Sequence, residues 1–167
     1  QLRVLAAQSS ASAAEFQDAI ASLSDGLILW NAQDRVSTWN RRCEEILPHA
    51  RDVLRQGLHF SDYVRRSIAL NHPHWSKAAV ERRAAERMAQ HRSRSGTGEF
   101  TTVDGRVIEV RENPTSDGGC VSVLRDITAE RRLLGRLTHN EAELQRALAS
   151  EREINVQQRQ FVSMASH

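Results

Sequence analysis

The longest regular pattern of apolar and polar positions lies in the last forty residues of the chain. This stretch contains no proline and a single glycine, Gly135, on a background rich in the helix-forming residues Leu, Ala, Glu, Gln and Arg. Positions spaced alternately three and four apart are mostly apolar: Leu133, Leu137, Asn140, Leu144, Ala147, Glu151, Ile154, Gln158, Phe161 and Ala165. Because such a repeat keeps one seam of a helix facing a partner helix, it predicts a coiled coil.

Three polar residues interrupt this seam. With Leu137 at heptad position a, Asn140 falls at d, and Glu151 and Gln158 fall at a. Polar side chains at these positions lower the stability of a coiled coil and fix its register. We interpret the seam as a dimer helix loose enough to rotate or slide, the alternative being imperfect packing tolerated in a long helix. His167 falls at position c, outside the seam.

Shorter apolar runs predict five strands. Leu27 to Trp30 is an apolar run typical of a strand buried on both faces, and Arg35 to Trp39 returns from it as a hairpin. Asp104-Gly105 is a hairpin turn that joins two further strands. These strands and the last one span Phe100 to Val103, Arg106 to Glu112 and Cys120 to Ile127. The order predicts an α+β fold with an antiparallel sheet.

Helices are expected between and before these strands. Residues 1 to about 24 form a helical pattern, in which we assign residues 1–13 to an upstream connector helix, with a frayed terminus as the alternative. Asn40 is suited to cap a helix from Arg41 to Ile46. Residues 49–92 are helical with breaks, with Ser61 or Asp62 as one cap and Ser76 as the cap of a helix running to about His91.

Composition restricts the class of protein. The 167 residues allow one domain plus a helical extension, and the net charge of +2 with interleaved signs predicts no nucleic-acid partner. No apolar run approaches the roughly 20 residues of a membrane span, so we expect no membrane contact in this segment. The two cysteines form neither a metal-binding spacing nor a disulfide framework, so we expect no metal and a cytoplasmic setting. Because the chain starts without Met, we expect part of a longer protein, with membrane anchoring upstream left open.

The element order and several residues resemble the PAS sensor domain over about Ala14 to Thr128. The residues that carry the resemblance are Asp25-Gly26, Asp34, Asn40, Gly105 and the triplet Asp126-Ile127-Thr128. The resemblance implies a five-stranded antiparallel sheet with helices on one face, which senses a signal and biases the coiled coil that follows. It also implies that the triplet is the signal exit, where Asp126 pairs with Arg131 or Arg132 and Thr128 caps the helix. The alternative is a cap and a surface ion pair worth under about 1 kcal/mol.

The last eight residues, Gln160 to His167, resemble the start of the phosphoacceptor motif of bacterial sensor histidine kinases. In that family an acidic residue, an aromatic residue or Leu, Arg, Thr and Pro follow the histidine, and this sequence stops before them. The resemblance implies that His167 accepts a phosphoryl group from ATP and Mg²⁺ held by a separate domain and passes it to a response regulator. A neutral imidazole nitrogen is a competent nucleophile near neutral pH. The alternative is a helix-end histidine stabilised by the helix dipole.

The sequence offers only weak candidates for ligand-binding residues. His72 and His74 flank Pro73, and Cys120 lies in the last strand. Some members of the PAS family bind haem through a histidine in the region of His72, His74 and His91, but a polar loop or helix end is the favoured interpretation. Cys120 would be a redox sensor only if its thiolate were stabilised. We expect no cofactor in this segment, with haem as the disfavoured alternative.

These predictions divide the chain into a connector helix (1–13), a PAS domain (14–127), a signalling coiled coil (128–159) and the start of the dimerisation and phosphotransfer helix (160–167). The predicted function is sensing and homodimerisation in a sensor histidine kinase, without catalysis by the segment itself. Two alternatives remain: a PAS module that only joins two chains, and a ligand-binding PAS domain that feeds a non-kinase effector.

Overall fold

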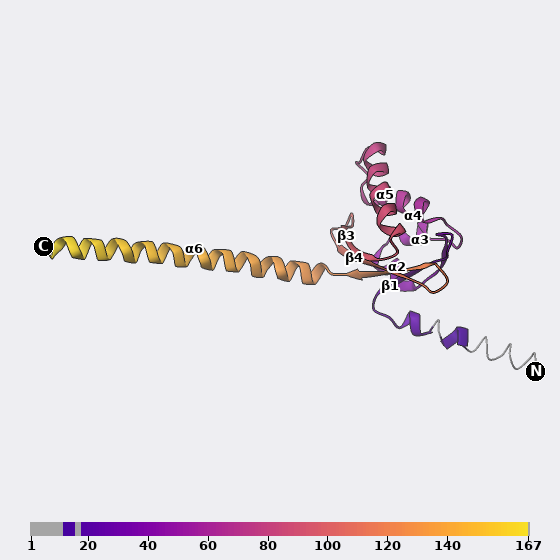
Figure 1. Cartoon of the computed structure of the whole chain (residues 1–167), viewed down its shortest axis with the longest axis horizontal. Coiled ribbons are helices and arrows are strands. Elements are labelled where there is room, and N and C mark those ends of the chain that lie inside the picture. The colour runs from indigo at the N-terminus through magenta and orange to yellow at the C-terminus, as the bar shows by residue number, and fades with distance from the viewer. Residues whose placement is uncertain (1–11, 16–17, 167) are drawn as a thin grey trace, which may run out of the picture. The chain divides into compact units, whose positions relative to one another are not determined.

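The computed structural model describes residues 12–15 and 18–166 of the chain (Figure 1). The chain divides into two compact units, residues 1–127 and 128–167, which are considered separately. Residues 12–15 and 18–21 are helical. Most of the predicted connector helix, and His167, lie outside the described residues.

The first unit contains a five-stranded sheet. Its strands are β1 (Gly26–Trp30), β2 (Val36–Trp39), β3 (Gly96–Thr101), β4 (Val107–Pro114) and β5 (Cys120–Asp126). They lie in the order β2-β1-β5-β4-β3, and every neighbouring pair is antiparallel. The predicted five-stranded antiparallel sheet is therefore confirmed. The first and last strands of the domain are neighbours in the middle of the sheet, with Leu27 opposite Val123.

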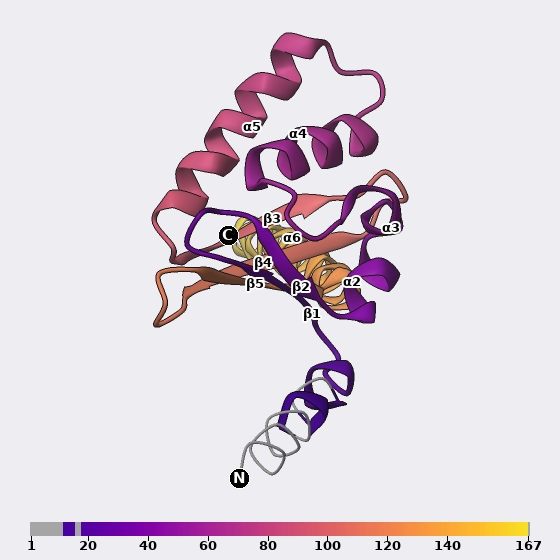
Figure 2. The same cartoon turned by 90° about the vertical axis from the view of Figure 1, so that its right-hand side faces the viewer.

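Four helices connect β2 to β3, namely α2 (Arg41–Ile46), α3 (Ala50–Val53), α4 (Phe60–Asn71) and α5 (Lys77–Arg92). Figure 2 shows α4 and α5 side by side above one face of the sheet. Apolar side chains from the helices and from the sheet form a single buried cluster, which includes Ile28, Trp30, Cys43, Ile46, Phe60, Val64, Ala84, Ile108, Val110 and Leu124. Burial of this apolar area is the main stabilising contribution to such a fold.

Strand β1 differs from the prediction in its burial. Ile28 and Trp30 are buried, whereas Leu27 and Leu29 are only half-buried. The strand is therefore covered fully on one face, and not on both as the continuous apolar run suggested. A short apolar run does not distinguish these cases, because side chains alternate between the two faces of a sheet.

Two element boundaries also differ from the prediction. Strand β3 starts at Gly96, within the segment expected to be a loop, because its backbone pairs with β4 in the register Gly96 to Glu112. Helix α4 starts two or three residues earlier than expected. Its cap is His59, whose Nδ1 accepts a hydrogen bond from the backbone N–H of Ser61 at 3.2 Å.

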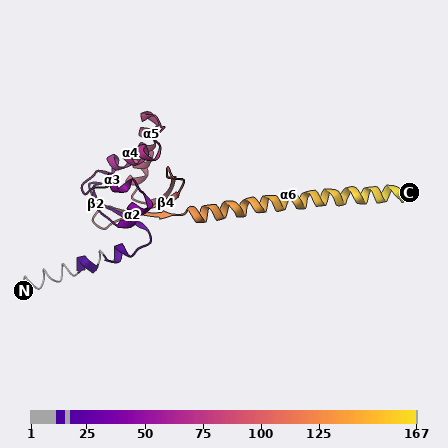
Figure 3. The same cartoon turned by 180° about the vertical axis from the view of Figure 1, so that it is seen from behind.

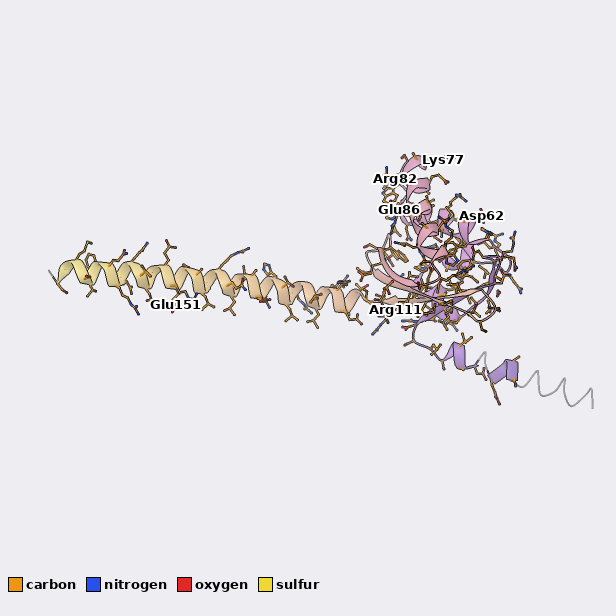
Figure 4. All side chains as sticks on the ribbon, in the orientation of Figure 1. Asp62, Lys77, Arg82, Glu86, Arg111 and Glu151 are labelled. Atoms are coloured by element: carbon orange, nitrogen blue, oxygen red, sulfur yellow. The ribbon has the colours of Figure 1, made fainter. Side chains whose placement is uncertain are left out.

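The second unit is the helix α6 (Thr128–Ala165), which continues without a break (Figure 3). None of its residues is buried within the described chain. Side chains stand out along both edges of the helix in Figure 4, Glu151 among them. The predicted long C-terminal helix is confirmed. Across the described residues, no helix combines the length and the apolar character that crossing a bilayer requires.

A buried side chain, Asn40, joins β1 to the helices. It is 5% exposed, and its Oδ1 accepts hydrogen bonds from the backbone N–H groups of Leu27 at 2.9 Å and Cys43 at 3.3 Å. Its Nδ2 donates to the carbonyls of Asp25 at 2.9 Å and Ile20 at 3.2 Å. Asn40 is therefore the predicted cap of α2 and also fixes the entry into β1.

Replacing Asn40 by Ala should lower the free energy of unfolding of the PAS domain by about 2–4 kcal/mol, because a helix cap is lost and buried backbone groups lose their partner. Chemical denaturation followed by circular dichroism measures the change. Gln33→Ala, at an exposed position of the preceding turn, is the matched control and should stay within about 0.5 kcal/mol of the wild type. Equal stability of the two variants would contradict this role of Asn40.

Candidate functional site

A cavity of about 90 Å³ lies between α4, α5 and the sheet. Its wall on the sheet side is largely apolar and includes Ile28, Val110 and Leu124. Its wall on the helix side carries polar groups, among them Ser67, Asn71, His72, Arg83 and Arg87. Such a mixture of apolar surface and a few polar groups is typical of small-molecule sites, although this volume is well below the roughly 300 Å³ at which drug-sized sites begin.

Two polar atoms near this cavity lack partners. His49 Nε2 and Ser67 Oγ are shielded from solvent and have no well-directed hydrogen bond among the described residues. Both residues line the cavity. Burial lowers the pKa of His49, against an opposing effect of the nearby Asp52 carboxylate, so the ring is neutral near pH 7. A molecule with hydrogen-bonding groups would satisfy both atoms.

A buried carboxylate, Glu112 on β4, lies at the centre of a charged network beside the cavity. Glu112 Oε1 forms an ion pair with Arg87 and lies 2.9 Å from His91 Nδ1. It also accepts a hydrogen bond of 3.2 Å from Ser122 Oγ, which in turn accepts one of 2.9 Å from Trp30 Nε1. The side chain of Glu112 is 4% exposed, so these partners replace the water that the charge lost on folding.

The electrostatics of Glu112 reflect a balance between burial and its partners. Burial by itself would raise the pKa of this carboxyl. Hydrogen bonds from His91 and Arg87, together with their positive charge, outweigh burial and hold its pKa at about 2. Glu112 is therefore ionised at neutral pH although it lies inside the domain.

The network extends from His91 to the turn between β1 and β2. The His91 ring is 1% exposed and stacks on Phe60 with 3.5 Å between ring centroids. Its Nε2 lies 3.3 Å from Asp34 Oδ1, which is 2.7 Å from Arg94 Nη2. Asp34 reaches this position because Asn31 closes the turn, accepting backbone hydrogen bonds at 3.0 Å, and because Asp34 itself adopts a φ of 55°. One chain of contacts thus joins the turn, α5 and β4.

His91, Glu112 and Cys120 place potential metal-ligand atoms within 4.8 Å of one another. Two observations argue against a divalent cation there. The guanidinium groups of Arg87 and Arg94 already neutralise Glu112 and Asp34. Burial, with a further effect of Glu112, raises the pKa of the Cys120 thiol, whereas a metal needs the thiolate. The cluster is an internal ion network.

The three residues predicted as ligand candidates fall in different environments. The His72 ring lines the cavity and stacks on Trp75, with 3.8 Å between ring centroids. His74 is exposed and does not line this cavity. Cys120 is fully buried with a raised thiol pKa, which disfavours the reactive thiolate of a redox sensor.

The predicted signal-transmission residues lie on β5 and α6. Asp126 ends β5, and Thr128 begins α6. The backbone N–H of Ile127 donates to the carbonyl of Val107 at 2.9 Å, which continues the pairing of β4 with β5. The seam residues Asn140, Glu151 and Gln158 are all exposed on α6. The predicted phosphoacceptor, His167, lies outside the described residues.

Sequence reasoning missed the network around Glu112. One signal was available, because Glu112 follows Ile108 and Val110 at a spacing of two, and this face of β4 is buried. An acidic residue in phase with buried apolar residues indicates a buried, paired carboxylate. Its partners on α5 are 21 and 25 residues away in sequence, and no local pattern identifies them.

Replacing Glu112 by Gln should destabilise the domain at pH 7 by on the order of 3 kcal/mol, because the half-buried guanidinium of Arg87 loses its counter-charge and the charge-assisted hydrogen bonds to Glu112 are lost. The pKa of Glu112 is lowered on folding from an ordinary 4.5 to about 2, so its stabilisation is complete above pH 4.5 and declines as the pH falls toward 2. The free energies of unfolding of the wild type and of Glu112→Gln, measured by denaturant titration, should therefore become equal at acid pH. Glu86→Gln, at an exposed position of α5 (Figure 4), is the control. If the wild type and Glu112→Gln differed in free energy of unfolding by the same amount from pH 7 to pH 2, the assignment would be contradicted.

Comparison with known proteins places these features in a family. The family model described as the PAS fold matches residues 20–134. The "non-motile and phage-resistance protein" of Caulobacter vibrioides is 31% identical over 149 residues, which cover 86% of this chain and 16% of that protein. The present chain thus spans only a small part of that relative.

Comparison with solved structures finds similarity to two PAS domains, of which one reaches a TM-score of 0.50. The PAS domain of BvgS from Bordetella pertussis has a TM-score of 0.50 at 12% identity, covering 79% of this chain and 98% of that one. A PAS domain from Colwellia psychrerythraea has a TM-score of 0.44 at 20% identity, covering 69% and 96%. With the match of the family model and the observed sheet order, the chain belongs to the PAS family.

Proposed function

We propose that this chain is the signal-sensing and dimerisation region of a two-component sensor histidine kinase. In this proposal the state of the PAS domain is relayed through α6 to the phosphoacceptor His167. The observation that carries the proposal is the order of parts: a PAS domain, then a 38-residue helix with an exposed heptad seam, at whose end the sequence Gln160 to His167 begins. Each part resembles the corresponding part of that class of kinase.

The surface of α6 supports a partner helix. Large apolar side chains of the seam are more than half exposed in the single chain, at 57% for Leu137, 62% for Leu144, 51% for Ile154 and 70% for Phe161. A row of this kind on a long helix is stable in water when a second helix covers it. We propose a parallel homodimer, because a parallel pair brings the two copies of His167 to the same end.

The relay would use the end of the sheet. Glu112 and the exit strand are linked because β4 pairs with β5 up to the register Ile108 to Asp126. A change in the network around Glu112 would shift this pair and alter the start of α6 at Thr128. A few kcal/mol between two arrangements is sufficient for such a switch. The polar seam residues Asn140, Glu151 and Gln158 would keep the two arrangements close in energy.

The chemistry would belong to the full protein. The imidazole of His167 would attack the γ-phosphorus of ATP, which a separate domain holds with Mg²⁺, and an aspartate of a response-regulator receiver domain would then take the phosphoryl group. The setting of these reactions would be the cytoplasm. A domain that only joins two chains is the competing hypothesis, and unpartnered polar atoms around the cavity favour sensing over that alternative.

In the full natural protein, His167→Gln should abolish labelling by ATP with γ-³²P in the presence of Mg²⁺, because the acceptor nitrogen is removed. His139→Gln is the matched control, since His139 is an exposed histidine on the same helix, and it should retain labelling. The isolated segment 1–167 should remain unlabelled. Labelling of the His167→Gln protein at the wild-type level would refute the phosphoacceptor assignment.

Dimerisation is tested with two neighbouring apolar residues of similar exposure. Ile154 is on the predicted seam and 51% exposed, whereas Val156 is on the outer face and 54% exposed. Ile154→Glu should weaken the dimer by at least about tenfold, because a charge replaces a seam contact, and Val156→Glu should leave it unchanged. Sedimentation equilibrium gives the dissociation constants. A wild-type chain that is monomeric at micromolar concentration would contradict the proposed dimer.

A further inference from the structure

The cavity between α4, α5 and the sheet has an uneven distribution of charge. Two arginines, Arg83 and Arg87, and two histidines, His49 and His72, line it, and no acidic residue does so in the described part of the chain. The acidic partners of the two arginines, Glu86 and Glu112, lie outside this lining. An occupant with a negative charge is therefore favoured over a neutral or cationic one.

The polar atoms that lack partners point to the same class of ligand. Ser67 Oγ carries a hydrogen that has no acceptor of good geometry, although the Tyr63 hydroxyl lies close enough to interact with it. His49 Nε2 is neutral and, in its Nε2-protonated tautomer, is also a donor without an acceptor. A carboxylate offers two oxygens that accept hydrogen bonds from such donors.

The remaining walls limit the size and character of the ligand. The sheet side presents the apolar side chains of Ile28, Val110 and Leu124. An inorganic anion would leave this surface without a partner and would lose its hydration, whereas a short alkyl group fills it. The volume of about 90 Å³ restricts the ligand to a few non-hydrogen atoms. The combination describes a short-chain carboxylate.

We propose that this cavity binds a short-chain organic carboxylate and that Arg87 is shared between the ligand and Glu112. This inference rests on the proposed sensory function. It adds the chemical class of the signal and identifies Arg87 as the residue that binds it.

Arg87 has the geometry for a shared role. It lies between the cavity and the network, pairs with Glu112, and has its guanidinium carbon 5.2 Å from the centroid of the Phe60 ring. A guanidinium has five N–H donors, so several remain for a ligand after the pair with Glu112 is made. His91 and Ser122 continue to bind Glu112 if Arg87 turns toward a ligand.

The consequence of binding would be transmitted along the sheet. A carboxylate in the cavity competes with Glu112 for the same guanidinium. Glu112 lies opposite Ser122 of β5 in the sheet register, and β5 leads to Asp126. If the ion pair between Arg87 and Glu112 weakens, the position of β5, the strand that precedes α6, changes as a result.

The test uses the ¹⁵N-labelled segment 1–167 titrated with sodium propionate and sodium butyrate, with the neutral isostere propionamide as the control ligand. We expect saturable shifts for Val110, Leu124 and the Arg87 Nε–H with the carboxylates, and binding of propionamide at least about tenfold weaker, because charge-assisted hydrogen bonds are lost. Absence of saturable binding of both carboxylates, or equal binding of propionamide, would overturn the proposal.

Variants separate recognition from loss of structure. Arg87→Gln should weaken propionate binding at least about tenfold, and Arg82→Gln, exposed on the same helix (Figure 4), should not. Ser67→Ala removes a hydroxyl that makes no well-directed hydrogen bond among the described residues, apart from its interaction with the Tyr63 hydroxyl, so it should fold normally and still bind about threefold more weakly. Wild-type affinity in both Arg87→Gln and Ser67→Ala would refute the assignment. These titrations need no kinase reaction, so their failure is distinguishable from failure of the His167 experiment.

Discussion

Burial of the Glu112 carboxylate is the constraint on which the rest of the domain depends. A charge in this position costs several kcal/mol unless it is neutralised and hydrogen-bonded. Groups from α5 and β5 meet this requirement. Arg87 and His91 of α5 and Ser122 of β5 all contact Oε1 of Glu112. Helix α5 therefore cannot shift along the sheet without disturbing the charge, and the position of α5 in turn defines one wall of the cavity.

The same requirement links the edges of the domain to its centre. Asp34, in the turn between β1 and β2, contacts His91 and Arg94, so the β1–β2 hairpin is connected to the end of α5. On the other side of β1, Asn40 ties the start of the strand to α2. Side-chain contacts thus hold both the start of β1 and the turn that follows it. In the proposed relay, changes at the cavity would reach the exit through the paired strands β4 and β5.

Much of the fold could be predicted from the sequence because it is local. The cap at Asn40, the Asp104-Gly105 turn and the long helical pattern after Thr128 depend on residues a few positions apart. The glycine-rich start of β3 was not predictable from propensity, because glycine disfavours strands and only the pairing with β4 imposes one. The ion network and the cavity depend on contacts between distant residues, and the cavity is the space that packing leaves between elements. The period-two burial of β4 indicates a buried carboxylate at Glu112, but no periodicity in the sequence identifies its partners or the cavity.

The most direct test of the account is a pulsed-EPR measurement of the distance between spin labels at position 156 on the two chains of the full protein. If the buried carboxylate sets the state of the paired helices, the wild-type distribution should be narrow. It should shift in Glu112→Gln and be unchanged in Glu86→Gln. Identical distributions in all three folded proteins, or no dipolar coupling between chains in the wild type, would contradict the claim that the sheet controls a helical dimer.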